Sequence, residues 1–293
     1  MTKKNLIVGQ SGGPTAVINS SLYGVVSEGL RQENVEHVYG MVNGIEGFLK
    51  GNVLDFQESL PDGQLEYLTY TPGAYLGSCR YRLPESLEDP VYPALFQQFE
   101  KMNIGWFFYI GGNDSMDTVS KLSRYAAMTG SDIRIIGEPK TIDNDLVHTD
   151  HTPGYGSAAR YVASTVREIT LDANVYDKKS VTIVEIMGRH AGWLTAASAL
   201  ARKYENDNPL LIYLPETPFD PKAFLEKVEA SFEKNCNVVV CVSEGIKDIN
   251  GTFICEYDNS VGTDTFGHKL LAGCGKYLEN LVRSRLGVKA RSI

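Results

Sequence analysis

Residues 133–145 read IRIIGEPKTIDND, and this stretch decides the fold. The apolar run Ile133–Ile136 predicts a buried strand of a parallel sheet, because four residues bounded by polar breakers are too few for a helix. A glycine, a proline, a lysine and two aspartates follow in GEPKTIDND, Gly137–Asp145. Ligands of open α/β sheets bind in the crevice outside the carboxyl ends of the strands. The stretch therefore predicts a parallel sheet with a ligand site at its edge.

The rest of the chain repeats this alternation of strand and helix. The pattern predicts an α/β fold of two lobes, each a mainly parallel, doubly wound sheet flanked by helices. We expect the first lobe over residues 1–156 and the second over residues 157–293. Strands are expected at Asn5–Gly9, Val35–Val42, Ile104–Ile110, Ser180–Ile186, Pro209–Leu214 and Val238–Val242, and helices at Pro14–Arg31, Pro93–Met102, from Gly111 to Thr129, Ser157–Asn174, after MGRHAG (187–192) through Arg202 and at Pro221–Lys234.

The composition excludes several classes of protein. With 43% hydrophobic and 22% charged residues over 293 positions, the chain is an ordinary globular protein with a sizeable core. A net charge of -8 argues against nucleic acid or an anionic membrane as partner. The five cysteines are odd in number and lack zinc-site spacing, as free cytosolic thiols do. Because the sequence shows neither a signal-peptide core nor an apolar run of membrane length, we expect a cytoplasmic protein.

Two glycine pairs follow predicted strands and precede predicted helices. The first lies in QSGGP, residues 10–14, and the second in GGNDS, residues 111–115. Paired glycines let backbone N–H groups approach an anion, and a helix N-terminus adds a favourable dipole. QSGGP matches neither the GxGxxG fingerprint nor the Walker loop. A merely tight turn, and plain helix capping by Asp114 and Ser115, are the alternatives. Two such turns in one α/β domain favour two walls of one anion site.

Basic side chains stand beside glycines in two further loops. Arg80 and Arg82 follow a Gly-Ser lead in TPGAYLGSCRYRL, residues 71–83, and suit a bidentate grip on phosphate. A solvated surface pair is the alternative for these two arginines. Arg189 lies in MGRHAG, residues 187–192, directly after a predicted strand, where a cation can face bound phosphate. His190 beside it is better explained as a residue at the N-terminus of a helix.

A set of motifs resembles the 6-phosphofructokinase family in order and spacing. The resemblance covers essentially the whole chain, and TIDND with MGR at this separation is highly specific. It implies transfer of a phosphoryl group to the 1-hydroxyl of fructose 6-phosphate, giving fructose 1,6-bisphosphate in glycolysis or gluconeogenesis. The motifs are GGPTAVIN (12–19), LGSCR (76–80), GGNDS (111–115), PKTIDND (139–145), MGRHAG (187–192) and SEGI (243–246).

The resemblance also implies roles for single residues. Asp143 matches the catalytic base that accepts the proton of the sugar's 1-hydroxyl, and phosphoryl transfer asks of it mainly correct placement. Asp145 and Thr141 match the neighbours that orient this base and the sugar. The lobe 1–156 would then carry the donor, the metal and the catalytic loop, and the lobe 157–293 the sugar phosphate. The other matching positions are donor contacts (Gly12, Gly13, Arg80) and contacts to the sugar or the transferred phosphoryl group (Met187, Gly188, Arg189, Glu244).

Two positions concern the identity of the donor. ATP-using relatives typically have glycine where this chain has Asp114 and Lys140. The Asp114 carboxylate occupies the room of an α-phosphate and repels it, whereas Lys140 adds a cation for the free terminal phosphate of pyrophosphate. Both substitutions match the pyrophosphate-dependent branch of the family, whose reaction is expected to be readily reversible. A Mg²⁺ ion is implied, with Asn113 standing where relatives have a metal-binding aspartate.

Other interpretations stay open at this point. An ATP-dependent phosphofructokinase is the alternative within the enzyme class. In relatives the strand matching Val288–Ile293 is followed by a Gln-Arg motif that grips the sugar 6-phosphate, so we expect a shortened form with weakened sugar-phosphate binding. A non-catalytic protein that binds phosphate or sugar phosphate is therefore the alternative from another class. Relatives form dimers or tetramers, which implies a homo-oligomer.

Overall fold

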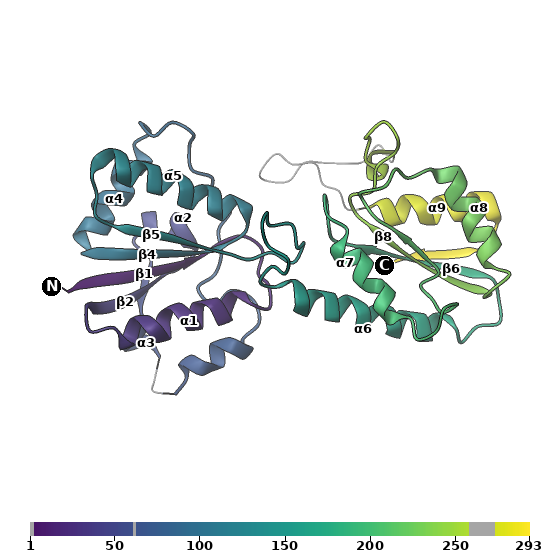
Figure 1. Cartoon of the computed structure of the whole chain (residues 1–293), viewed down its shortest axis with the longest axis horizontal. Helices are drawn as coiled ribbons and strands as arrows, with labels where there is room; N and C mark the ends of the chain where they lie inside the picture. The colour runs from purple at the N-terminus through teal and green to yellow at the C-terminus, as the bar shows by residue number, and fades with distance from the viewer. Residues whose placement is uncertain (1–2, 61–62, 258–272) are drawn as a thin grey trace. The chain divides into compact units, whose positions relative to one another are not determined.

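The computed structural model describes residues 3–60, 63–257 and 273–293 (Figure 1). By its internal contacts the chain divides into two compact units, Met1–Thr141 and Ile142–Ile293, and each is described by itself. The division falls between Thr141 and Ile142, upstream of the expected boundary after residue 156. The loop from Ile142 to Gly154 is therefore part of the second unit.

The first unit is built on a five-stranded sheet with the strand order β3-β2-β1-β4-β5. All neighbouring strands are parallel except β2 and β3. The chain adds strands on one side of β1 and then crosses to β4 on its other side, so β1 and β4 form the topological switch point. The strands are β1 (Lys4–Gln10), β2 (Val35–Met41), β3 (Val53–Asp55), β4 (Ile104–Gly111) and β5 (Arg134–Pro139), and the helices are α1 (Ile18–Arg31), α2 (Gly44–Leu49), α3 (Phe56–Ser59), η1 (Leu65–Tyr70), α4 (Val91–Lys101) and α5 (Asn113–Thr129).

Helices cover both faces of this sheet because its strands alternate side chains between two cores. In β1, Ile7 belongs to the core shared with α2, α4 and α5, whereas Leu6 and Val8 belong to the core shared with α1, α3 and η1. Figure 1 shows α4 and α5 on one side of these strands and α1 and α3 on the other. The predicted doubly wound, mainly parallel sheet is confirmed for this unit.

The strand in the opening stretch differs from its prediction in two ways. β5 is parallel to β4, as expected, but it is an edge strand, and the Ile136 side chain is 40% exposed. The prediction of a buried strand was therefore wrong, since an edge strand has a neighbour on one side only. The strand also continues through Gly137 to Pro139, because the residues from 137 to 139 pair with the last three residues of β4.

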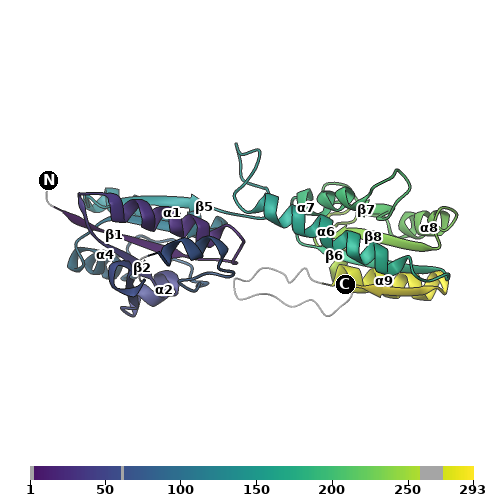
Figure 2. The ribbon, with the colours of Figure 1, turned by 90° about the horizontal axis from the view of Figure 1, so that it is seen from below.

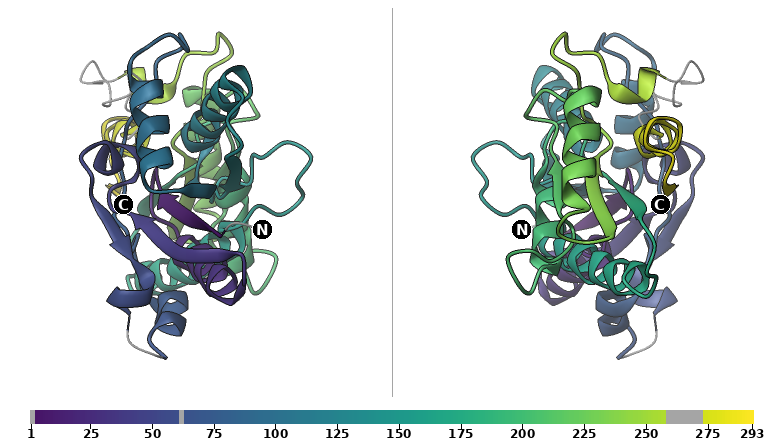
Figure 3. Two further views of the ribbon diagram at one scale, coloured as in Figure 1. Left: turned by 90° about the vertical axis from the view of Figure 1, so that its left-hand side faces the viewer. Right: turned by 90° about the vertical axis from the view of Figure 1, so that its right-hand side faces the viewer.

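The second unit holds a four-stranded, entirely parallel sheet with the order β7-β8-β6-β9. In β6, Val181 and Ile183 pack in the core of α8 and α9, whereas Val184 and Ile186 pack in the core of α6 and α7. Figures 2 and 3 show helices on both sides of these strands. The strands are β6 (Ser180–Ile186), β7 (Leu211–Tyr213), β8 (Asn237–Ser243) and β9 (Lys289–Ser292), and the helices are α6 (Tyr155–Ala173), α7 (Trp193–Ala197), η2 (Ser198–Ala201), α8 (Pro221–Ser231), η3 (Ile254–Tyr257) and α9 (Cys274–Leu286).

Most predicted helix bounds differ from the observed ones by a few residues, and two differences have a clear structural reason. Helix α1 begins at Ile18 rather than at Pro14, because the Ile18 N–H bonds to the Thr15 carbonyl in a turn that precedes the helix. The helix expected after MGRHAG and through Arg202 is the short α7 followed by the 3₁₀ turn η2, a tightening that is common at helix ends. No helix in the described part of the chain is long and apolar enough to cross a membrane.

Candidate active site

The two glycine turns lie at the switch point of the first sheet. Gly12 and Gly13 follow β1, and Gly111 and Gly112 close β4, which is hydrogen-bonded to β1 along its length. Gly12 has a φ of +78°, a conformation that side chains disfavour, and a Cβ at Gly13 would meet no atom of the described residues within 4 Å. Open backbone at the carboxyl ends of two adjacent parallel strands is where α/β sheets bind ligands.

Lys140 ties these two turns together. Its backbone N–H donates to the Gly111 carbonyl at 3.0 Å, and its ammonium Nζ donates to the Gly13 carbonyl at 2.6 Å. The side chain is only 4% exposed, so the charge is held at the turn rather than free to swing in solvent. The structure therefore brings Lys140 to the glycine turn, as the donor argument required.

Helix α5 begins at Asn113, directly after Gly112, and points its N-terminus at the same place. Its N-cap is Gly112, which offers no side chain to the first N–H groups. The alternative that Asp114 and Ser115 are plain helix caps is therefore wrong. Asn113 and Asp114 are both exposed in the first turn, and a long helix with uncapped N–H groups favours an anion there.

The loop that carries Arg80 is anchored to the first glycine turn. The Ser78 hydroxyl donates to the Gly12 carbonyl at 2.6 Å, and the Ser11 hydroxyl donates to the Cys79 carbonyl at 3.3 Å. Cys79 is buried while Arg80 is exposed, so Cys79 fixes the loop in the protein and Arg80 points its side chain to solvent. The sequence analysis missed Ser78 as a positioning residue, although it lies inside the LGSCR motif.

In the second unit, the MGR and SEG turns lie side by side at the ends of neighbouring strands. Ile186, the last residue of β6, is in register with Ser243, the last residue of β8. The Ser243 hydroxyl donates to the Gly188 carbonyl at 2.5 Å, and the Glu244 N–H donates to the Ile186 carbonyl at 2.9 Å. The structure thus brings Met187, Gly188, Arg189 and Glu244 together, with Ser243 as a contact that the sequence analysis did not assign.

The Glu244 carboxylate is held beside the MGR turn. Its Oε1 accepts a hydrogen bond from the Gly188 N–H at 3.2 Å. Burial raises the pKa of Glu244, while the Gly188 N–H and the charge of Arg189 oppose that shift. Gly245 packs against the Arg189 backbone so closely that an added Cβ would lie 2.0 Å from the Arg189 carbonyl oxygen.

The TIDND loop is pinned by its central asparagine. Asn144 has a φ of +56° and is 6% exposed, and its carboxamide oxygen accepts from the Thr152 N–H at 2.8 Å. Its amide nitrogen donates to the Asp150 carbonyl at 3.2 Å. Asparagine tolerates this left-handed conformation better than most residues. On either side of it, Asp143 has one buried carboxylate oxygen and Asp145 is exposed.

His190 lies before the helix rather than in it, since α7 begins at Trp193. The explanation of His190 as a helix residue was therefore wrong. Partial burial and the charges of Lys247 and Arg189 lower the pKa of His190, so its ring is neutral at pH 7. A neutral imidazole adds no positive charge to the turn that carries Arg189.

With this geometry in hand, the chain can be compared with known proteins. The sequence profile of the family described as Phosphofructokinase matches residues 5–293. This chain belongs to the phosphofructokinase family. The predicted family resemblance is confirmed, because the match covers both glycine turns, the TIDND loop and the MGR and SEG turns.

Individual phosphofructokinases differ in how similar they are to this chain. The pyrophosphate–fructose 6-phosphate 1-phosphotransferase of Xanthomonas campestris pv. campestris is 44% identical over 292 residues, which cover 99% of this chain and 69% of that protein. The crystal structure of the pyrophosphate-dependent phosphofructokinase from Nitrosospira multiformis matches with a TM-score of 0.85 at 36% identity, covering 99% of this chain and 68% of that one. The ATP-dependent 6-phosphofructokinase of Teredinibacter turnerae is 30% identical, covering 98% of this chain and 84% of that protein.

Oxygen ligands for a metal are few in this phosphofructokinase. Over residues 3–60, 63–257 and 273–293, no three His, Cys, Asp or Glu side chains converge on one metal position. The exposed carboxamide of Asn113 and carboxylate of Asp114 are the side chains that offer oxygen at the start of α5. Mg²⁺ commonly keeps several waters and binds through one or two side-chain oxygens plus substrate phosphates. These two residues fit a cation that arrives with the phosphates.

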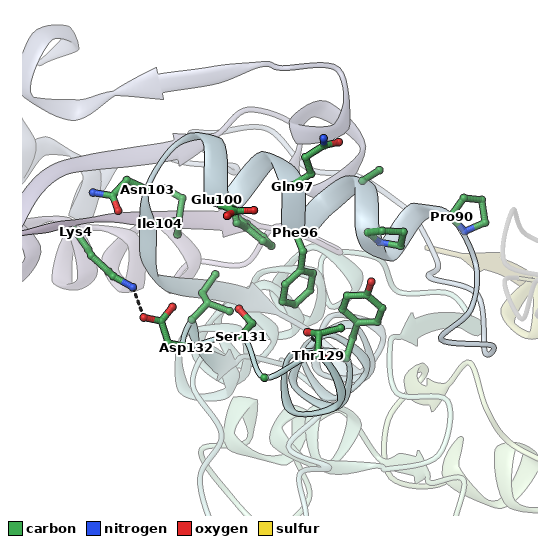
Figure 4. Close-up of a pocket in the computed structure, with 16 residues that line it drawn as sticks. Lys4, Pro90, Phe96, Gln97, Glu100, Asn103, Ile104, Thr129, Ser131 and Asp132 are labelled. Carbon is green, nitrogen blue, oxygen red and sulfur yellow. Dashed lines mark hydrogen bonds and ion pairs between the residues drawn. The ribbon is translucent and has the colours of Figure 1, made fainter.

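A large cavity in the first unit lies away from these motifs. It has a volume of about 980 Å³ and is lined by residues from the amino ends of β1 and β4, from the whole length of α4, and from the carboxyl end of α5 and the residues that follow it. Figure 4 shows Phe96 in its wall and the Lys4–Asp132 ion pair at its side. The glycine turns lie at the opposite, carboxyl ends of the same strands. Cavity size therefore does not mark the candidate active site in this unit.

Proposed function

We propose that this chain transfers a phosphoryl group from pyrophosphate to the 1-hydroxyl of fructose 6-phosphate, in a reversible reaction that gives fructose 1,6-bisphosphate and phosphate. One observation carries the choice of donor. The Lys140 ammonium lies 2.6 Å from the Gly13 carbonyl, and Asp114 stands in the first turn of the helix after the second glycine turn. A fixed cation suits the free terminal phosphate of pyrophosphate, and the carboxylate repels the α-phosphate of a nucleotide.

On the donor side, each residue acts on phosphate oxygens. The N–H groups at Gly12 and Gly13 and at the start of α5 donate to them, while Lys140 and Arg80 supply positive charge. A Mg²⁺ ion, held through Asn113 and the phosphates, would supply further neutralisation of the donor oxygens. These contacts orient the phosphorus that is attacked, and placement is the main contribution in phosphoryl transfer.

On the sugar side, Asp143 accepts the proton of the 1-hydroxyl as that oxygen attacks the terminal phosphorus. The bond from this phosphorus to the bridging oxygen breaks, and phosphate leaves with the bond's electron pair. Asp145 and Thr141 orient the base and the sugar. The Glu244 carboxylate accepts hydrogen bonds from sugar hydroxyls, and Arg189, with the backbone at Met187 and Gly188, binds the sugar or the transferred phosphoryl group.

A coupled assay tests the donor directly. Purified protein, fructose 6-phosphate and Mg²⁺ are mixed with either pyrophosphate or ATP, and formation of fructose 1,6-bisphosphate is followed. We expect turnover with pyrophosphate at least about a hundredfold faster than with ATP, since a like charge placed against the α-phosphate costs several kcal/mol. Equal rates with both donors would contradict the donor argument. Absence of turnover with either donor at high substrate would favour the non-catalytic binding protein.

Two substitutions make the same test on the residues themselves. Asp114→Gly combined with Lys140→Gly should lose most pyrophosphate activity and gain some ATP activity, because the repelling carboxylate and the phosphate-binding cation are both removed. The control is Asp89→Asn combined with Lys101→Met. It also removes one negative and one positive charge, but outside the glycine turns, so it should leave the donor preference unchanged.

We also propose that the protein acts in the cytoplasm as a homo-oligomer, a dimer or a tetramer. The family resemblance supports an oligomer, and the composition supports a cytosolic enzyme with free thiols. Size-exclusion chromatography with light scattering at working concentration tests the first point, and a monomer with full activity would contradict it.

A further inference from the structure

Lys121 is a buried lysine that the proposed reaction does not use. It lies in the middle of α5 and is 1% exposed. Three acceptors surround its ammonium: the Asp117 carboxylate at 2.7 Å, the Glu85 carboxylate at 2.8 Å and the Leu83 carbonyl at 3.0 Å. A lysine ammonium has three hydrogens to donate, so these contacts satisfy all of them.

The charge of Lys121 is kept by these partners. Burial is the largest single influence and lowers the pKa of the lysine, but the hydrogen bonds and the negative charges of Asp117 and Glu85 together outweigh it and raise the pKa above its ordinary value. Asp117 is on the same helix, one turn earlier. Leu83 and Glu85 belong to a different segment, so the ammonium joins α5 to that segment.

The segment that Lys121 holds is the one that presents Arg80. Residues 77–85, which include the arginine loop 79–85, form no helix or strand, so side-chain contacts must hold them. At its start, the Ser78 hydroxyl bonds to the Gly12 carbonyl. At its end, Lys121 holds Leu83 and Glu85, and the Tyr92 hydroxyl donates to the Pro84 carbonyl at 2.5 Å. Arg80 lies between these two anchors.

We infer that Lys121 is a positioning residue for the donor site, which fixes the arginine loop 79–85 relative to helix α5. The same helix carries Asn113 and Asp114 at its N-terminus, so one buried ammonium sets the distance between two groups of donor contacts. This inference rests on the proposed function, because Arg80 is a donor contact only if pyrophosphate binds there. A misplacement of about 1 Å in such a contact can lower a rate or an affinity by up to roughly a hundredfold.

The test compares Lys121→Met with the same substitution at another lysine that pairs with a glutamate. Methionine is unbranched and only one atom shorter than lysine, and it removes the charge. Lys50→Met is the control, because Lys50 also pairs with a glutamate, Glu46 at 2.8 Å, but on an exposed helix end. We expect Lys121→Met to raise the KM for pyrophosphate roughly ten- to a hundredfold, while the KM for fructose 6-phosphate stays within about twofold. Lys50→Met should change neither constant.

A second variant keeps the inference testable if the first fails to fold. Glu85 has a side chain that is 73% exposed, so Glu85→Ala removes one hydrogen-bond partner of Lys121 without opening the core. Hydrogen exchange measured by mass spectrometry then reports on the loop without any activity. We expect faster exchange over residues 79–85 in both variants, with no change in peptides of the second unit.

The outcomes separate the inference from the proposed function. Wild-type protein that uses neither donor would refute the proposed function. In that case the role of Lys121 is still tested by comparing the variants with the wild type in two measurements, the calorimetric affinity for pyrophosphate and the hydrogen exchange of the loop. An unchanged pyrophosphate affinity, or unchanged exchange over residues 79–85, overturns the inference. So does an equal loss of affinity for both substrates, because that result marks Lys121 as a purely structural residue.

Discussion

Gly245 offers a sharp test of how the sugar side is built. A Cβ added at this position would lie 2.0 Å from the Arg189 carbonyl oxygen, 2.6 Å from its carbonyl carbon and 2.8 Å from its Cα. All three are backbone atoms, so no change of rotamer relieves the overlap. The substitution Gly245→Ala must therefore move the MGR turn away from the SEG turn.

The size of the effect follows from that overlap. Separations below 3.0 Å are essentially never seen for a real Cβ, so the Arg189 carbonyl must shift by about 1 Å. A displacement of this size in a residue that places the reacting groups lowers kcat/KM by about a hundredfold, or about 2.7 kcal/mol of transition-state stabilisation. The strain also lowers the free energy of unfolding by about 1–3 kcal/mol.

The assay measures kcat/KM for fructose 6-phosphate at saturating pyrophosphate, together with thermal unfolding. Gly24→Ala is the matched control, because Gly24 lies inside α1 and, among the residues that the structure describes, its added Cβ would meet no atom outside its own helix within 4 Å. That control should keep full activity and gain roughly 0.5–1 kcal/mol of stability, since alanine loses less backbone entropy in a helix. If folded Gly245→Ala keeps kcat/KM within about threefold of the wild type, the reasoning is refuted.

Three further predictions concern other contacts. Asn144→Ala should lower kcat at least about tenfold, because it removes the hydrogen bond from the Thr152 N–H and strains a residue at a φ of +56°. Asn144→Gly restores the backbone freedom but not the hydrogen bond. Equal activity of the wild type and both variants would contradict the role of this loop. The Lys276 hydrogen bond and other contacts lower the pKa of Glu279 from 4.5 to about 2, so Glu279 stabilises the fold above pH 4.5 and loses this effect as the pH falls toward 2. Urea unfolding of Glu279→Gln should accordingly show a deficit at pH 7 that vanishes near pH 2, and a deficit independent of pH would exclude the charge as its cause. Chelation of divalent cations should stop turnover and added Mg²⁺ restore it, whereas undiminished activity in excess chelator would contradict the proposed part of Asn113 in metal binding.

Several features of the fold could be predicted because they depend on local pattern. The strand Ser180–Ile186 was predicted to the residue, since its sequence alternates and is rich in β-branched side chains. The helix after GGNDS also ends where expected, at Thr129, because Gly130 follows it in a left-handed C-cap. The parallel α/β class follows from the same alternation of short apolar runs and amphipathic helices.

By itself, the sequence determined that glycine turns, arginines and aspartates follow strands, which is enough for the family and for a phosphoryl-transfer chemistry. Only the tertiary structure decided which of these ends are neighbours, because strand order depends on pairing between distant segments. It placed β1 beside β4, so that the two glycine turns share one switch point. It also put IRII at the sheet edge, and through the reach of two long side chains it brought Lys140 to Gly13 and Lys121 to the loop of Arg80.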